Sequence, residues 1–239
     1  MTGSHLTSNQ IDRIPRHDRD PVLSDGVAHP QKVIPVAFGR EPLEVRYHRT
    51  GWRHLSFEVN EIKRCHTAAL ILTDGQHVGS LEVNEFRVAP SLTSNEFLEG
   101  MDTDSQATYD LADVLCANWY EIGAISDFGD IVELKRAWMS ARFSNRGRFA
   151  AAANALIGRL FKRRSLLILK AFPLEYEGNV TEGNNDSFIL RQRAMKRHYQ
   201  KIFGVLPFPG TDGENGWMYS VPERLRDIIP SPLGRVQPS

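Results

Sequence analysis

One stretch of the chain, residues 130–175, places a helix-forming segment between two apolar segments. The first apolar segment, Ile131–Phe143, is long enough for a central strand, and Ser165–Ala171 is a nearly continuous apolar run that is typical of a strand buried on both faces. The alanine-rich segment between them, Phe149–Phe161, has helical composition. This order predicts an α/β (α+β) fold in which the two apolar segments are neighbouring parallel strands of a mixed, twisted sheet with helices on both faces.

The loop that precedes the helix, Ser144–Arg148, is basic and contains Gly147. A loop that opens directly into a helix leaves several backbone N–H groups unpaired and aimed at one point, and this arrangement suits a phosphate. Arg146 and Arg148 add positive charge there. The loop alone is also compatible with an ordinary crossover whose arginines lie in water, because two arginines and one glycine are common.

Over a longer span, this loop, the small-residue helix start, the following strand and Ala171-Phe-Pro-Leu-Glu175 together resemble the cofactor-binding core of the GCN5-related N-acetyltransferase (GNAT) superfamily. In that family an Arg-x-x-Gly-x-Gly/Ala loop holds the pyrophosphate of acetyl-CoA. The pattern falls here on Arg146, Phe149 and Ala151, so the final small residue is kept and Phe149 replaces the middle glycine. The resemblance implies a V-shaped split between the two central parallel strands, through which the pantetheine arm passes.

The resemblance also implies acetyl-CoA as co-substrate and no metal. The cofactor-binding residues that it implies are Ala141, Arg146, Gly147, Arg148, Phe149, Ala150 and Ala151. Phe149 leaves two alternatives open, because a glycine lets the backbone approach the phosphates without a side chain between them. The phenylalanine either points into the core and leaves its N–H available, or fills the pyrophosphate cradle.

Further matches extend the resemblance from Leu43 to Val221. Met101–Cys116 resembles a helix entry that Asp104 or Ser105 would cap. Its buried side would carry Leu111, Val114 and Leu115. Ser187–Gly204 resembles the late helix of the family, in which Tyr199 shortly precedes a glycine, and Gly216–Val221 would be the closing strand. The basic residues of the late helix are interpreted either as a solvated face or as contacts to the adenosine phosphate; they are Arg191, Arg193, Lys196, Arg197 and Lys201.

Transfer of an acyl group from a thioester to an amine needs a base for the amine, a donor for the oxyanion and an acid for the leaving thiolate. Tyr199 is the candidate acid, and its alternative is a packing role with a local hydrogen bond. Glu133 lies early on the first predicted strand, at a position where some family members with protein substrates carry a general-base glutamate. Without that match, a strand glutamate is more often an outward, solvated residue.

Three functions therefore remain open. The first is an acyl-CoA-dependent N-acyltransferase acting on an amine of a small molecule or a protein. The second is a GNAT-shaped binding or regulatory module without activity, which the replacement at Phe149 favours. The third is acyl-homoserine-lactone synthesis on a related fold, to which Ala141-Arg142-Phe143 bears a faint similarity.

The composition of the 239 residues, of which 41% are hydrophobic, predicts a single domain with tails. We expect an irregular arm over residues 1–40, the acyltransferase-like domain over 41–222 and a tail over 223–239. The 29 basic and 29 acidic residues give a net charge of zero, which indicates neither a nucleic-acid partner nor a membrane partner, and a homodimer is left open. The chain shows no signal peptide, and Cys65 and Cys116 have no disulfide pattern, so the expected compartment is the cytoplasm.

Other chemical motifs are missing. The histidines are scattered without metal spacing, and neither a serine-hydrolase elbow nor a phosphate-binding loop of NTPases occurs. Asp74-Gly75, between the alternating segments Thr67–Thr73 and Val78–Val88, predicts a β-hairpin. Leu43–Tyr47 and Phe57–Ile62 also alternate like strands.

Overall fold

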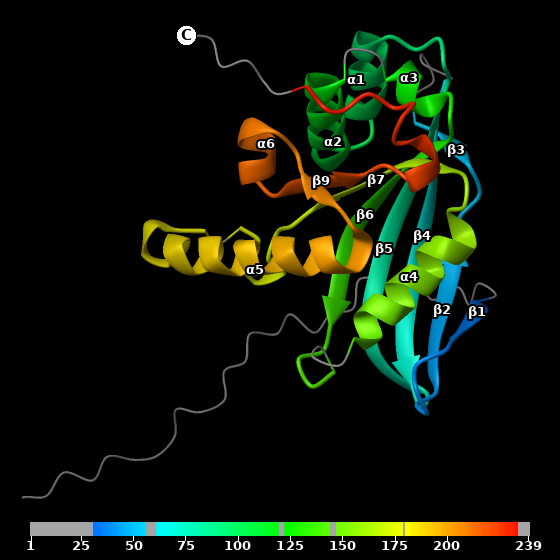
Figure 1. Ribbon diagram of the computed structural model, residues 1–239, viewed down its shortest axis with the longest axis vertical. Coiled ribbons are helices and arrows are strands. Elements are labelled where there is room, and N and C mark those ends of the chain that lie inside the picture. The colour runs from blue at the N-terminus through cyan, green and yellow to red at the C-terminus, as the bar shows by residue number, and fades with distance from the viewer. Residues whose placement is uncertain (1–30, 56–60, 120–121, 144–146, 179, 234–239) are drawn as a thin grey trace, which may run out of the picture.

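The computed structural model describes residues 31–55, 61–119, 122–143, 147–178 and 180–233. Over these residues the strands form one open, mostly antiparallel, nine-stranded sheet (Figure 1). The strands are β1 (Lys32–Val36), β2 (Leu43–Arg49), β3 (Arg53–His54), β4 (Ile62–Thr73), β5 (Gln76–Val88), β6 (Asp130–Met139), β7 (Arg164–Lys170), β8 (Leu206–Pro207) and β9 (Trp217–Ser220). They lie in the order β1-β2-β4-β5-β6-β7-β9-β8, and β3 pairs with β4 outside this path.

Helices cover both faces of the sheet. They are α1 (Ser94–Asp102), α2 (Gln106–Asn118), α3 (Gly123–Ser126), α4 (Arg148–Leu160), α5 (Asn185–Phe203) and α6 (Gly210–Glu214). Successive strand residues point to opposite faces, and Val132 and Leu134 of β6 belong to one hydrophobic cluster while Ile131 belongs to the other. The first cluster contains the buried side of α4, and the second contains the buried sides of α1 and α2. The predicted mixed α/β fold is confirmed at this level.

The predicted strand–helix–strand unit is confirmed with small shifts. β6 and β7 are neighbours and run parallel, with Asp130–Leu134 opposite Arg164–Leu169, and α4 crosses over between them. Leu134 is the last residue of β6 with a partner in β7, whereas β6 continues beside β5 as far as Met139. The strand therefore ends four residues before the predicted Phe143, because residues 141–143 form a turn in which the N–H of Phe143 donates to the carbonyl of Ser140.

A β-bulge lies in β6 where this pairing with β7 stops. Val83 of β5 faces Leu134 and Glu82 faces Arg136, so Lys135 is the extra residue. Residues directly opposite share a face of the sheet, so Glu133, opposite Asn84, and Arg136, opposite Glu82, lie on one face. The bulge thus keeps Glu133 and Arg136 on the same side although they are three residues apart.

The hairpin and the helix cap are also confirmed. Asp74 and Gly75 both have positive φ values, 50° and 75°, and connect β4 to β5 as a two-residue turn. Ser105 is the N-cap of α2 and accepts a hydrogen bond from the N–H of Thr108. The buried side of α2 carries the three predicted apolar residues, Leu111, Val114 and Leu115.

Three parts of the chain differ from the expectation or lie outside the description. β1 belongs to the sheet, although residues 1–40 were expected to be irregular. It is an edge strand that contains Pro35, and β8 at the opposite edge contains Pro207. The predicted strand Phe57–Ile62 falls mostly on residues outside the described ranges. In the expected tail, Leu225 and Ile229 are buried in the second hydrophobic cluster, so this segment packs on the domain.

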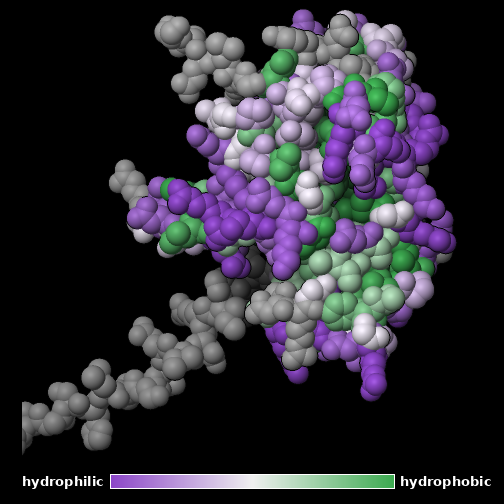
Figure 2. Space-filling model, viewed as in Figure 1, coloured by the Kyte–Doolittle hydropathy of each residue, from purple (hydrophilic) through white to green (hydrophobic). Residues whose placement is uncertain are grey.

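α5 projects from the body of the molecule (Figure 1) and has a largely hydrophilic surface (Figure 2). Only Gln192 and Tyr199 of this helix are buried. Gly204, in the left-handed conformation, ends the helix as predicted for the late helix. Among the described residues, no helix is both long and apolar enough to cross a membrane.

The start of the parallel pair requires a glycine at position 129, and this requirement can be tested. Gly129 has a φ of 151°, and a Cβ there would lie 1.7 Å from the carbonyl oxygen of Arg163. We expect Gly129→Ala to lower the free energy of unfolding by about 3 kcal/mol, because the added carbon overlaps the backbone that begins β7. Gly158→Ala, exposed on α4 with open space around its Cβ, should instead raise it by about 0.5–1 kcal/mol. Urea unfolding of both variants measures the difference, and equal effects would contradict this account.

Candidate functional site

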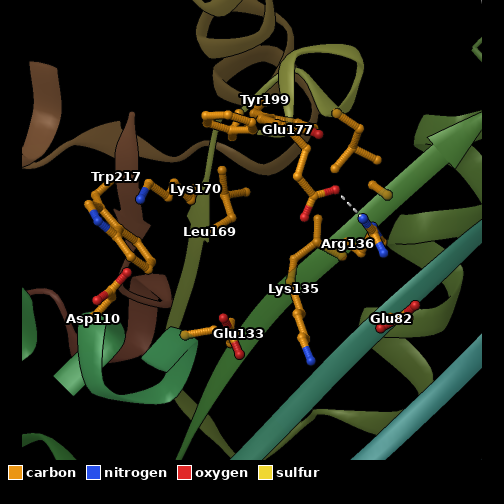
Figure 3. Close-up of a pocket in the computed structure, with 15 residues that line it drawn as sticks. Glu82, Asp110, Glu133, Lys135, Arg136, Leu169, Lys170, Glu177, Tyr199 and Trp217 are labelled. Carbon is orange, nitrogen blue, oxygen red and sulfur yellow. Dashed lines mark hydrogen bonds and ion pairs between the residues drawn. The ribbon is translucent and has the colours of Figure 1, made fainter. Parts of the chain in front are cut away.

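A pocket of about 430 Å³ opens beside the point where β6 and β7 stop pairing (Figure 3). β5, β6, β7, α2, α5 and the segment that follows β7 all contribute to it. Its lining residues are Glu82, Ala107, Asp110, Glu133, Leu134, Lys135, Arg136, Ala137, Leu169, Lys170, Phe172, Leu174, Glu177, Tyr199 and Trp217. Two candidate catalytic residues predicted from the sequence, Glu133 and Tyr199, line this one pocket.

Glu133 is buried, with 7% of its surface exposed, so the interpretation as an outward, solvated strand residue is wrong. The side-chain amide of Asn84, directly opposite on β5, donates a hydrogen bond of 2.8 Å to the carboxylate. Burial raises the pKa of Glu133 to about 6, and the Asn84 hydrogen bond and the charge of Lys135 oppose part of that rise. A carboxyl group with such a pKa is ionised at neutral pH and still has appreciable affinity for a proton.

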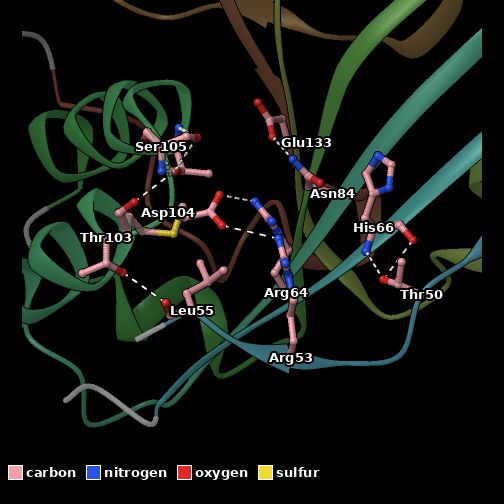
Figure 4. A network of polar contacts seen from close by, with 12 residues as sticks. Thr50, Arg53, Leu55, Arg64, His66, Asn84, Thr103, Asp104, Ser105 and Glu133 are labelled. Atoms are coloured by element: carbon pink, nitrogen blue, oxygen red, sulfur yellow. Dashed lines mark hydrogen bonds and ion pairs between the residues drawn. The ribbon is translucent and has the colours of Figure 1, made fainter. Parts of the chain in front are cut away.

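A polar network beside Glu133 holds α2 against the sheet (Figure 4). Asp104, just before the α2 N-cap, accepts hydrogen bonds from Arg64 of β4 and from Arg53 of β3. Thr103 donates to the carbonyl of Leu55 at 3.1 Å. Because α2 supplies Ala107 and Asp110 to the pocket, this network fixes one wall of the pocket relative to the strand that carries Arg64.

Tyr199 lies at the opposite end of the pocket from Glu133 (Figure 3). Its ring packs near the rings of Phe203 and His198, with centroids 6.0 Å apart in each case, and 7% of the residue is exposed. Burial raises the pKa of its phenol to about 12, so the hydroxyl keeps its proton at neutral pH. The ring therefore packs as the predicted alternative describes, whereas within the described part of the chain no hydrogen-bond partner is found for the hydroxyl.

The expected cofactor residues lie apart from this pocket. Ala141 is exposed in the turn after β6, and Gly147–Ala151 form the start of α4; none of them lines the pocket. Arg146 lies outside the described residues. The structure therefore brings the two predicted catalytic residues together but does not place the predicted cofactor loop in the same pocket.

Among the described residues, no side chain caps the start of α4. Its N-cap, Gly147, has a φ of 73°, which favours glycine, and makes no side-chain capping bond. The first N–H groups of a helix have no partner within the helix, so those of Arg148, Phe149 and Ala150 are free of intrahelical bonds. The ring of Phe149 is buried in the core, stacked on His198 at 6.1 Å and edge-on to Phe203 at 6.4 Å. The ring of Phe149 therefore points into the core, as in the first of the two alternatives.

Arg148 has a structural role that the sequence analysis did not predict. Its guanidinium is buried and donates to the carboxylate of Glu41 in the turn between β1 and β2. It also lies over the rings of Phe38 and Phe143, at 5.8 and 5.4 Å from their centroids. One of its nitrogens, Nη1, is buried without a partner.

Two basic residues of α5 contact neighbouring segments. Arg191 pairs with Glu175, and Lys196 donates to the backbone carbonyls of Gly213 and Glu214. These two residues therefore attach α5 to neighbouring segments and are not simply a solvated face.

Several pocket residues were missed by the sequence analysis. They include Glu82, Asp110, Lys135, Arg136 and Glu177. Asn84, which donates to Glu133 from outside the pocket lining, was missed as well. Asn84 carried a weak signal, since an amide in the middle of an otherwise alternating strand needs a hydrogen-bond partner when it is buried. The others lie on four separate parts of the chain, namely β5, α2, β6 and the segment that follows β7, and nothing in their spacing along the chain indicates that they meet.

Across the described ranges, no group of three or more His, Cys, Asp or Glu side chains is arranged to hold a metal ion. No family model matches the chain, and no curated protein matches it.

The raised pKa of Glu133 predicts a pH-dependent stability. Since the pKa in the folded protein, about 6, exceeds the ordinary value of 4.5, Glu133 stabilises the fold fully below pH 4.5 and loses that contribution as the pH rises through 6. Glu133→Gln is neutral at every pH. We expect its free energy of unfolding to gain about 2 kcal/mol relative to wild type between pH 4.5 and pH 7.

Urea unfolding of both proteins at the two pH values measures this gain. Glu99→Gln, an exposed carboxylate on α1, is the matched control and should show a much smaller change. A pH-independent difference between Glu133→Gln and wild type would mean that the carboxylate titrates normally.

Proposed function

We propose that the protein is an acyl-CoA-dependent N-acyltransferase, with acetyl-CoA as the acyl donor and an amine as the acceptor. The observation that carries this proposal is that Glu133 and Tyr199, from β6 and α5, line one pocket beside the end of the β6–β7 pairing. Both side chains are buried and both have pKa values raised by burial, and perturbed pKa values cluster at functional sites.

The end of the β6–β7 pairing supports a path for the pantetheine arm. Beyond Leu134, β6 continues with β5 as its partner, and β7 continues with β9 as its partner. We infer that the two strands separate here as a V-shaped split. Backbone groups of β6 that face the split are then available to the two amide groups of pantetheine, much as an added strand would pair with a sheet edge.

The start of α4 supports a site for the pyrophosphate. The first-turn N–H groups and the helix dipole favour an anion at this terminus. The replacement of a glycine by Phe149 favoured the alternative of a binding module without activity. Because the ring of Phe149 is buried in the core, the replacement no longer favours that alternative.

The two predicted catalytic residues divide the chemistry between them. The amine nitrogen attacks the thioester carbonyl, the C–N bond forms, and the nitrogen becomes acidic as it gains positive charge. Glu133, ionised at neutral pH, accepts that proton. The C–S bond then breaks and the electron pair leaves with sulfur.

Tyr199 acts on the departing sulfur. Its phenol, with a pKa of about 12, is a weaker acid than an ordinary thiol with a pKa near 8.5, so complete proton transfer to the thiolate is unfavourable. We therefore propose that Tyr199 donates a hydrogen bond that stabilises the developing thiolate. Cys65 and Cys116 are both free cysteines, which accords with a reducing compartment such as the cytoplasm.

The first test concerns the pyrophosphate site and uses two variants of Ala150 in the first turn of α4. Ala150→Glu places a negative charge at the helix terminus and should weaken acetyl-CoA binding by about tenfold or more, because it competes for the same N–H groups. Ala150→Gln adds nearly the same bulk without charge. It should bind acetyl-CoA much more tightly than Ala150→Glu does. Calorimetry on purified protein measures both affinities. Equal losses would indicate a steric effect, and no loss in either variant would place the pyrophosphate elsewhere.

The second test concerns Tyr199. Tyr199→Phe retains the ring and its packing on Phe203 and removes only the hydroxyl, which acts in the transition state. The variant should bind acetyl-CoA normally and lose about 10²-fold in kcat. Acetyl transfer to a panel of amines, followed by release of free thiol, measures the rate. An unaltered rate would assign Tyr199 to packing alone, and absence of acetyl-CoA binding by the wild type at millimolar ligand would refute the proposed function.

A further inference from the structure

Three carboxylates form one wall of the pocket. Glu82 comes from β5, Asp110 from α2 and Glu133 from β6, and all three lie on the side of the pocket away from Tyr199 (Figure 3). They reach the pocket from three elements, so they do not form a charged run on one exposed helix face. The side chain of Glu82 is only 16% exposed, and Glu133 is more deeply buried.

Two of these carboxylates accept a hydrogen bond from a neutral amide, and the third lies near a histidine. The amide of Asn84 donates to Glu133 at 2.8 Å, and the amide of Gln106 donates to Asp110 at 2.8 Å. Glu82 lies 3.9 Å from the ring of His66, whose pKa is lowered by burial, so the imidazole is neutral at pH 7. Neutral donors orient a carboxylate without cancelling its charge.

The pocket has three cationic side chains, and they do not pair with the three carboxylates of this wall. Arg136 pairs with Glu177, and Lys170 lies 5.2 Å from the ring centroid of Trp217. Lys135 is exposed, and its charge acts on Glu133 from solvent. Across the described ranges, none of the three wall carboxylates forms an ion pair with an arginine or a lysine.

A second observation at the same pocket is independent of the charges. Tyr199 is more than nine-tenths buried, lines the pocket and has a hydroxyl without a partner among the described residues. The hydroxyl oxygen itself is open to the pocket, so a ligand that fills the pocket can form a hydrogen bond with it. The pocket therefore presents a hydroxyl without a partner at one end and, at the other, three carboxylates that form no ion pair with an arginine or a lysine among the described residues.

We propose that the acceptor is a polycationic amine, in which one amino group reacts beside Glu133 while a second, protonated amino group is bound by Glu82 and Asp110. This inference rests on the proposed function and narrows its substrate class. Partly buried carboxylates are costly without a counter-charge, and an ammonium group supplies both the charge and the hydrogen-bond donors. The reacting amine stays close to Glu133 because the second amine is anchored on the same wall.

Calorimetry with the acetyl-CoA-free protein tests the proposal through two probes that differ in charge number. Spermidine carries several amino groups and butylamine carries one. We expect spermidine to bind at least about tenfold more tightly at low salt, and the difference to shrink as salt is added. Equal affinities for the two amines would overturn the proposal.

Two charge-removing variants identify the anchoring side chains. Glu82→Gln and Asp110→Asn should each weaken spermidine binding by about tenfold while changing butylamine binding little. Glu99→Gln on α1, an exposed carboxylate outside the pocket, is the matched control and should bind spermidine like wild type. If Glu82→Gln does not fold, Asp110→Asn decides, and unchanged spermidine affinity in the folded variants would refute the proposal.

An acetyl-transfer assay distinguishes failure of the polycationic acceptor from failure of the proposed transferase function. Spermidine binding without acetyl-CoA binding would refute the transferase and leave the polycation site intact. Transfer to butylamine with the same kcat/KM as to spermidine would leave the transferase intact and refute the polycationic acceptor. A trilysine peptide, assayed beside spermidine, shows whether the preferred amino groups come from a free polyamine or from a basic peptide.

Discussion

The short parallel pairing of β6 with β7 is the constraint on which the rest of the structure depends. Parallel strands cannot be joined by a tight turn, so the chain crosses one face of the sheet as α4 and places the start of that helix after the end of β6. The pairing stops at Leu134, and the pocket lies along the next residues of β6. The position of the uncapped helix terminus and the position of the pocket therefore follow from one strand pairing.

Local patterns were sufficient to predict the elements around this pairing. The apolar runs of β6 and β7, the alanine-rich α4 and the Asp74-Gly75 turn each depend on neighbouring residues in the chain. β1 was not predicted, because a five-residue edge strand with a proline has almost no local signal and is stabilised by its partner β2. The early end of β6 depends likewise on a turn within residues 140–143, where the apolar pattern continues without a strand.

The candidate site was less predictable from the sequence. A family resemblance selected Glu133 and Tyr199, but their burial depends on α2, α5 and the bulge at Lys135, which are tertiary features. Asn84 is 49 residues from Glu133 in the chain, and only the register of β5 against β6 places them opposite each other. Arg148 shows the reverse case: its charge suggested a phosphate ligand, yet its carboxylate partner Glu41 lies 107 residues away.

Each of the two edge strands of the described sheet contains a proline. β1 and β8 are the outermost strands, and Pro35 and Pro207 give each of them a residue without a backbone N–H. A proline has no N–H for the sheet ladder and is tolerated mainly in edge strands, and many proteins use such residues to prevent edge-to-edge aggregation. The long β4–β5 hairpin, with its strongly apolar strands, lies between these edges. The backbone of this hairpin is therefore paired with a neighbouring strand on each side. The outer strands of the described sheet, which contain the prolines, are poor templates for further sheet growth.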